Sequence, residues 1–250
     1  MNLLSHDVFV CIDCEATGLD TESDRVIEIA AVKFTFQEIL DSMESLIDPG
    51  CTISAASQEI HHISQDMVQN KPKVQEILPA LLKFIDKHIL VGHGIGFDIA
   101  LLTEEAKRAQ IPSSLPSLIS IDTLRLARLY GESPSNSLEQ LRKHFNIEPE
   151  GAHRAMSDVI VNIEIFKHLS SPFKTTKELL TRLEKPIQIK TMPLGKYKGR
   201  RFDEIPLEYL HWALKKDFDQ DLRFSIEVEL RKRKRGKSFE QAANPFSSLF

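Results

Sequence analysis

The sequence predicts an α/β protein in which a mixed sheet is flanked by helices, and three observations support this fold class. Residues 8–12 are an apolar and β-branched run, typical of a strand buried on both faces. Residues 26–36 and 38–47 are also rich in strand-forming residues, and a tight turn between them predicts an antiparallel pair. Residues 72–87 carry apolar side chains at helical spacing and lead into a short apolar run at 89–91.

Further elements follow along the chain. A short strand is expected at 118–121, and helices are expected at 98–108, 122–130, 138–145, 155–169, 177–183, 205–214 and 221–231. Asp122 is interpreted as a helix cap, not as a metal ligand. The domain boundaries that we predict are 1–170 for the main domain, 171–190 for a linker, 191–235 for a small basic module and 236–250 for a tail.

Composition limits the class of protein. With 250 residues, 42% of them hydrophobic, the chain is long enough for a substantial core. Apolar runs stay below the roughly 18 residues that span a bilayer, and residues 1–7 lack the pattern of a secretory signal, so we expect a cytoplasmic protein. Cys11 and Cys14 lie three residues apart on a strand and therefore face opposite sides, which favours buried free thiols over a redox or zinc-binding pair. With Cys51, the chain has an odd number of cysteines.

Two acidic side chains follow the first strand. Asp13 and Glu15 are two residues apart, and because strand side chains repeat with period two, both should point the same way. Two carboxylates at the edge of a core repel each other, and a divalent cation bound through oxygen relieves that repulsion. The alternative, a strand that runs out into a polar turn, remains open from these two residues alone.

Two later segments carry further acids. His93 to Asp98 follows the apolar run at 89–91, and His153 to Asp158 opens a helical segment. Together with the first strand, these segments supply four acids and a histidine in a fixed order: Asp13, Glu15, Asp98, His153 and Asp158. This order of residues resembles the DEDDh (DnaQ-like) family of 3′–5′ exonucleases, which includes proofreading subunits of bacterial replicative polymerases, ribonuclease T and oligoribonuclease. The family's first motif, Asp-x-Glu-x-Thr-Gly, is complete at 13–18, and its third, His-x-Ala-x-x-Asp, is complete at 153–158. The second motif usually has Asn where this chain has Gly94, so a polar contact is missing there.

The resemblance implies a ribonuclease H-like fold and a two-ion site for Mg²⁺ or Mn²⁺. Four carboxylates without a cysteine or histidine cluster independently favour such hard cations. The resemblance assigns Asp13 to both ions, Glu15 and Asp158 to one, and Asp98 to a contact through water. It makes His153 the base that takes a proton from the attacking water. The expected substrate-binding residues are Ala16, Thr17, Gly18, His61 and Phe97; a surface or capping role for His61 is the alternative.

The reaction implied is release of nucleoside 5′-monophosphates from the 3′ end of a nucleic acid. DNA with single-stranded or mispaired ends is the favoured substrate, and an RNA-processing exonuclease is the alternative. A non-catalytic nucleic-acid-binding adaptor is disfavoured, because all four acids and the histidine are present.

Charge is divided unevenly along the chain. Residues 1–170 hold 14 Lys and Arg against 25 Asp and Glu, a balance of −11, whereas residues 171–250 hold 18 against 11, a balance of +7. An acidic body attracts phosphate polymers poorly, so we expect the basic end to contribute nucleic-acid attraction; a solubility role is the alternative.

The C-terminal region resembles a small uncharacterised bacterial module that is appended to exonuclease domains, through its Met-Pro-x-Gly-Lys-Tyr-Lys-Gly segment at 192–199. Its basic residues with Tyr197 either grip a single strand or form a structural turn; they are Lys196, Lys198, Arg200 and Arg201. The basic run 231–237 either binds phosphates or is a solvated helix end. Residues 244–250 are similar to peptides that dock on the sliding clamp, which makes the clamp a candidate partner; packing or disorder is the alternative. The resemblance to proofreading subunits implies a DNA polymerase subunit as a second candidate partner.

Overall fold

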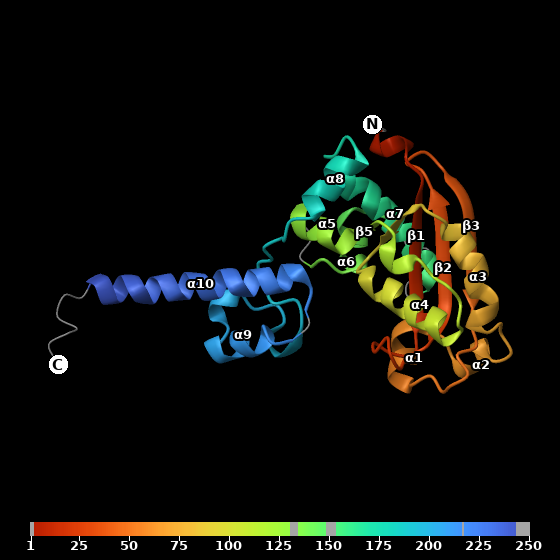
Figure 1. The fold of residues 1–250 in the computed structure, drawn as a ribbon, viewed down its shortest axis with the longest axis horizontal. Helices are drawn as coiled ribbons and strands as arrows, with labels where there is room; N and C mark the ends of the chain where they lie inside the picture. Colours follow the sequence, from red (N-terminus) through yellow and green to blue (C-terminus); the bar gives the residue numbers. More distant parts are fainter. Residues whose placement is uncertain (1–2, 131–134, 149–153, 217, 244–250) are drawn as a thin grey trace. The chain divides into compact units, whose positions relative to one another are not determined.

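The computed structural model describes residues 3–130, 135–148, 154–216 and 218–243. The chain divides into two compact units, residues 1–182 and 183–250, which are described separately (Figure 1).

The first unit is built on the mixed sheet that the sequence predicts. Its strands are β1 (Phe9–Ala16), β2 (Val26–Phe34), β3 (Ile39–Leu46), β4 (Ile89–Gly92) and β5 (Ser120–Asp122), in the spatial order β3-β2-β1-β4-β5. The pairs β1–β2 and β2–β3 are antiparallel, whereas β1–β4 and β4–β5 are parallel. β1 therefore lies at the centre of the sheet, which explains why its first residues are apolar on both faces.

Helices cover both faces of β1, as its continuous apolar run requires. Val10 and Ile12 pack in a core cluster with α3 (Val74–Ile85) and α4 (Gly96–Arg108). Phe9 packs instead against Phe166 of α7 (Ala155–Ser170), with ring centroids 5.2 Å apart. Odd-numbered residues of β1 therefore face α7. The other helices are α1 (Ala55–His61), α2 (Gln65–Val68), α5 (Thr123–Tyr130), α6 (Leu138–His144) and α8 (Thr176–Leu183).

The boundary between the units differs from the predicted one. Residues 171–182 were expected in a linker, but they belong to the first unit. Leu4 N donates to Lys174 O at 3.0 Å, and Thr176 Oγ1 donates to Asp7 Oδ2. These hydrogen bonds, far apart in sequence, attach α8 to the N-terminal segment, and sequence periodicity carries no signal for such pairings.

The second unit has a small core of its own. It contains the 3₁₀ turns η3 (Gly195–Tyr197) and η4 (Phe202–Glu204) and the helices α9 (Leu207–Ala213) and α10 (Gln220–Ala243). The buried core residues are Met192, Phe202, Ile205, Leu210, Ala213, Leu222 and Ile226.

Helix α10 is longer than predicted, because it continues through the basic run and past residue 236, where the tail was expected to begin. Arg and Lys are good helix formers, and no proline interrupts the segment. Arg233 within this run donates to Ile205 O at 2.9 Å and to Phe202 O at 2.7 Å, so one of the run's cations holds the unit together. Among the described residues, no helix combines the length and the apolar character that crossing a membrane requires.

Candidate active site

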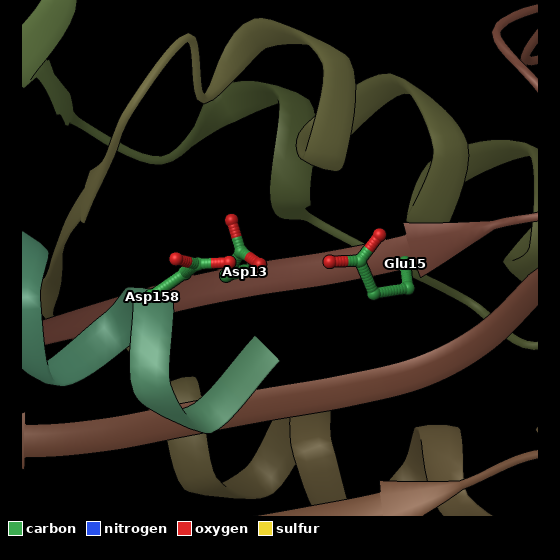
Figure 2. Close-up of side chains that lie close together, drawn as sticks. All are labelled: Asp13, Glu15 and Asp158. Atoms are coloured by element: carbon green, nitrogen blue, oxygen red, sulfur yellow. The ribbon is translucent and has the colours of Figure 1, made fainter. Parts of the chain in front are cut away.

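Three of the predicted acids lie together where β1 meets α7. Asp13 and Glu15 extend from the same face of β1, as strand periodicity predicts, and Asp158 comes from the first turn of α7 (Figure 2). One carboxylate oxygen from each lies within 4.8 Å of the other two. We call these three residues the acid group. The structure thus brings together residues that are 145 positions apart in the sequence (158 − 13).

Asp98 lies beside the acid group without belonging to it. It sits in the first turn of α4, is 5% exposed, and its Oδ1 accepts a hydrogen bond from Cys14 N at 3.0 Å. β1 and β4 are paired only as far as Cys11 and Val91, so the Cys14 amide lies beyond the paired part of these strands. Asp98 supplies the acceptor that this amide would otherwise lack.

The electrostatics of the site disfavour ionised carboxylates. Burial, and then the negative charges of Asp98 and Asp158, raise the pKa of Asp13 well above its ordinary value. Burial, followed by the charges of Asp158 and Glu28, raises the pKa of Glu15 to about 7. Burial also raises the pKa of Asp98 to about 7, against the lowering effect of its bond from Cys14 N. Oxygen-only donors that repel one another in this way fit a hard divalent cation, which offsets their charge.

Glu28 is a functional candidate that the sequence interpretation missed. It lies on β2 directly opposite Glu15, is 3% exposed, and accepts hydrogen bonds from Arg154 and Ala155. Arg154 Nε lies 3.0 Å from Glu28 Oε1, and Ala155 N lies 2.9 Å from Glu28 Oε2. Glu28 therefore fixes the start of α7, three residues before Asp158. The available signal was a lone acid inside the apolar run of residues 26–34.

Thr17 and Gly18, expected to bind substrate, hold the loop after β1. Thr17 Oγ1 donates to Asp24 Oδ1 at 2.8 Å and accepts from Arg25 N at 3.0 Å. A Cβ on Gly18 would lie 2.4 Å from Asp24 Oδ2, so the close approach of that carboxylate requires glycine. Thr17 is 8% exposed, and the hydrogen bonds of its hydroxyl serve loop structure.

The remaining predicted residues are placed as follows. Ala16 lies at a register irregularity at the end of β1, and Phe97 packs against the core from α4. His61 is 2% exposed and its Nδ1 accepts from Ile63 N at 3.0 Å, which weighs against direct phosphate contact by this side chain. His153 lies outside the described residues.

The structure agrees with two interpretations made for residues that flank the site. Asp122 Oδ1 accepts from Leu124 N at 2.9 Å, which is the capping role predicted for it, and also from Gly94 N at 2.8 Å. Cys11 and Cys14 are buried free thiols, and burial raises the pKa of both well above the ordinary value. Neither is therefore a thiolate nucleophile at neutral pH.

Comparison with known proteins identifies the first unit. A family model described as "Exonuclease" matches residues 10–166. DNA polymerase III subunit epsilon of Aquifex aeolicus is 35% identical over 167 residues, covering 66% of this chain and 81% of that protein. DNA polymerase III PolC-type of Clostridium perfringens is 34% identical over 173 residues, covering 69% of this chain but only 12% of that protein.

Solved structures share the fold. Exonuclease X in complex with 5′ overhanging duplex DNA has a TM-score of 0.56 and 25% identity, covering 71% of this chain and 99% of that one. Exonuclease I of E. coli in complex with a dA16 oligonucleotide has a TM-score of 0.62 and 20% identity, covering 72% of this chain and 43% of that one.

The second unit has a separate match. A family model described as "Putative quorum-sensing-regulated virulence factor" matches residues 179–222, and this description assigns no chemistry to them. For the first unit, two kinds of observation agree: the acid group has the oxygen donors of a metal-dependent nuclease, and the family model covers the strands and helices that carry this group. The chain belongs to the exonuclease family, in its DnaQ-like 3′–5′ branch.

Proposed function

We propose that this protein removes nucleoside 5′-monophosphates from the 3′ end of DNA, at single-stranded or mispaired termini. The observation that carries the proposal is the acid group of Asp13, Glu15 and Asp158, with Asp98 beside it. Two relatives named as DNA polymerase III components and a structural neighbour bound to DNA support DNA over RNA.

The acid group and Asp98 are the residues that would hold Mg²⁺ or Mn²⁺, with two ions as the family resemblance implies. When bound, such ions stabilise the negative charge that develops at the phosphoryl group and lower the pKa of bound water. The side chains supply oxygen donors only, from a central strand and two helices, and the repulsion among them is the driving force for cation uptake.

Hydrolysis forms a bond between a water oxygen and the terminal phosphorus and breaks the bond from that phosphorus to the preceding O3′. His153 takes the proton from the attacking water at an imidazole nitrogen, and the departing O3′ gains a proton from solvent. This role requires a neutral imidazole, which is the main form of an unperturbed histidine at pH 7.

The test is digestion of 5′-labelled single-stranded DNA and RNA of the same sequence, with Mg²⁺, Mn²⁺ or EDTA. A ladder shortening from the 3′ end, faster on DNA and absent in EDTA, is the expected result. Asp13→Ala should abolish it, whereas Asp41→Ala, which removes an exposed carboxylate from the edge strand β3, should leave it intact. Substantial metal-dependent digestion by Asp13→Ala would refute the proposed site, and faster digestion of RNA would reassign the substrate.

A polymerase partner is proposed from the relatives, and a sliding-clamp partner from the C-terminal sequence. Because this chain covers 12% of the Clostridium polymerase, association with a polymerase remains a proposal, supported by the names of that relative and of the epsilon subunit. The segment 244–250, which is similar to clamp-docking peptides, lies outside the described residues. Deleting it and measuring binding to purified sliding clamp tests that partner, and unchanged binding would end the idea.

A further inference from the structure

The second unit presents a tightly held basic loop at residues 195–199. The loop is closed at its base, where Met192 N donates to Arg200 O at 2.9 Å and Gly199 N donates to Met192 O at 2.8 Å. A Cβ at Gly195 would lie 2.8 Å from Tyr209 Oη, so glycine is required for the loop to approach α9. Lys196 and Lys198 are exposed on this loop, on either side of Tyr197.

An unbroken line of aromatic and cationic contacts runs from the loop along α9. The ring of Tyr197 lies 4.6 Å from that of Tyr209, which lies 5.1 Å from the ring of Trp212. An ammonium group stands at each end: Lys196 Nζ is 5.5 Å from the Tyr197 ring centroid, and Lys216 Nζ is 5.3 Å from that of Trp212. We call these five residues, together with Lys198, the aromatic–basic patch.

The aromatic rings of the patch differ in burial: Tyr197 and Tyr209 are partly buried against the unit's core, whereas Trp212 is exposed. Trp212, the sole tryptophan of the chain, is 47% exposed, whereas its α9 neighbours Leu210 and Ala213 are buried in the core. Exposing half of an indole forfeits hydrophobic stabilisation that an inward position would provide. The patch lysines form no ion pair with the described residues, unlike Arg201, which pairs with Asp203 at 2.8 Å. Rings and free cations together are the features that attract a partner with aromatic faces and negative charge.

We propose that the aromatic–basic patch binds single-stranded nucleic acid, with a base on the exposed indole of Trp212 and phosphates at the lysines. This inference rests on the proposed function, because the single strand that the patch would hold is the substrate of the proposed nuclease. Residues 1–170 carry a balance of −11, which repels phosphates, whereas residues 171–250 carry +7. Stacking on aromatic rings beside a positive surface is the general means of holding single strands without reading their sequence. The unit with the patch therefore retains the strand that the acidic unit shortens.

The sole tryptophan provides a direct measurement of patch occupancy. The full chain with Asp13→Ala, which cannot digest the ligand, is titrated with oligo(dT) in EDTA while indole fluorescence is recorded. Saturable quenching is expected, because Trp212 is the only indole and a stacked base quenches it. The apparent affinity should fall as salt rises, because phosphate contacts release counterions.

Variants separate the rings from the charges, using anisotropy of a labelled oligonucleotide as the measurement. Trp212→Ala should weaken binding roughly tenfold and Trp212→Phe should retain most of it, because phenylalanine keeps a stacking face. Lys196→Ala with Lys198→Ala should reduce the slope of log affinity against log salt by about 1.4, that is, about 0.7 for each phosphate contact on a single strand. The matched control, Lys83→Ala with Lys87→Ala, removes two exposed charges near α3 and should leave the slope unchanged.

Four further results would each contradict the binding of single-stranded nucleic acid by the patch. Unquenched fluorescence, or equal effects of the control pair and the loop pair, would overturn it. Equal quenching by polyglutamate would reassign the patch to acidic proteins, and stronger quenching by blunt duplex would reject single-strand binding. Failure of the proposed function is distinguishable, because it would appear as absent digestion by the unmodified chain, whereas patch binding is measured in Asp13→Ala without any digestion.

Discussion

Replacing Glu28 with glutamine should disturb the active site without touching any residue of the acid group. The Glu28 carboxylate accepts hydrogen bonds from Arg154 and from Ala155 N, and glutamine keeps only one acceptor oxygen and no charge. A charge-assisted hydrogen bond contributes about 1.5–3 kcal/mol, and loss of a helix cap costs about 1 kcal/mol. Because the Arg154 side chain is 43% exposed and water partly replaces its partner, we expect a loss of about 2–3 kcal/mol in the free energy of unfolding.

The functional effect should be a higher Mg²⁺ requirement. A loosened first turn of α7 misplaces Asp158, and the unpaired Arg154 cation stands near Glu15, so both changes weaken cation binding. Partners that orient metal ligands typically contribute 10- to 100-fold in metal affinity or activity, and we expect the Mg²⁺ midpoint of digestion to rise within about that range. The midpoint is measured on 5′-labelled single-stranded DNA at a temperature where circular dichroism shows the variant to be folded.

Glu105→Gln is the matched control. Glu105 is also buried, accepts from Arg25 Nε at 2.7 Å and from Val26 N at 3.3 Å, and sits on α4 outside the acid group. It should lose comparable stability and keep the wild-type Mg²⁺ midpoint. The reasoning is refuted if both glutamine variants shift the midpoint equally, or if Glu28→Gln leaves it unchanged.

Two further predictions concern charge and loop shape. In EDTA, stability should decrease between pH 5 and pH 8, because the folded protein holds protons on Glu15 and Asp98 up to pKa values of about 7, whereas the unfolded chain releases them near 4.5 and 3.8. The contribution of Glu15 is at most about 3 kcal/mol, and excess Mg²⁺ should flatten the decrease in melting temperature; a flat profile in EDTA would contradict the shifts. Gly94→Asn should fold normally and raise kcat/KM, because the residue has a φ of 72°, which asparagine tolerates, and open space where its Cβ would lie. Gly94→Val should lower the free energy of unfolding by about 1–2 kcal/mol. If kcat/KM is unchanged in Gly94→Asn, the asparagine side chain that the family usually carries at this position has no role in this protein.

The sequence predicted those features of the fold that depend on local pattern. The buried first strand, the antiparallel pair beside it and the helical stripe of α3 all follow from periodicity. The end of the first unit was placed too early, because it depends on hydrogen bonds such as that from Leu4 N to Lys174 O, between opposite ends of the unit. The length of α10 was underestimated, because a basic run is compatible with both a helix and a tail.

The acids of the site were accessible from motif and strand period, but their supports were not. Glu28 and Arg154 meet across 126 positions, and no spacing rule links them. The hydrogen bonds that join the Thr17 hydroxyl to Asp24 and Arg25 N were also out of reach, because the motif position of Thr17 concerns substrate binding, which stays a prediction, and carries no signal for loop contacts. Pairings that arise from the tertiary fold leave, at most, an isolated acid in an apolar strand as a trace in the sequence.

The hydrogen bond from Cys14 N to Asp98 Oδ1 gives one carboxylate two separable duties. As an acceptor, Asp98 completes the backbone of a strand whose neighbour has already diverged; as an anion, it adds to the field around Asp13. Asparagine at position 98 offers the same oxygen to the amide and discards only the charge. Asp98→Asn should therefore keep the hydrogen bond from Cys14 N and the native fold while it lowers the affinity of the site for a divalent cation.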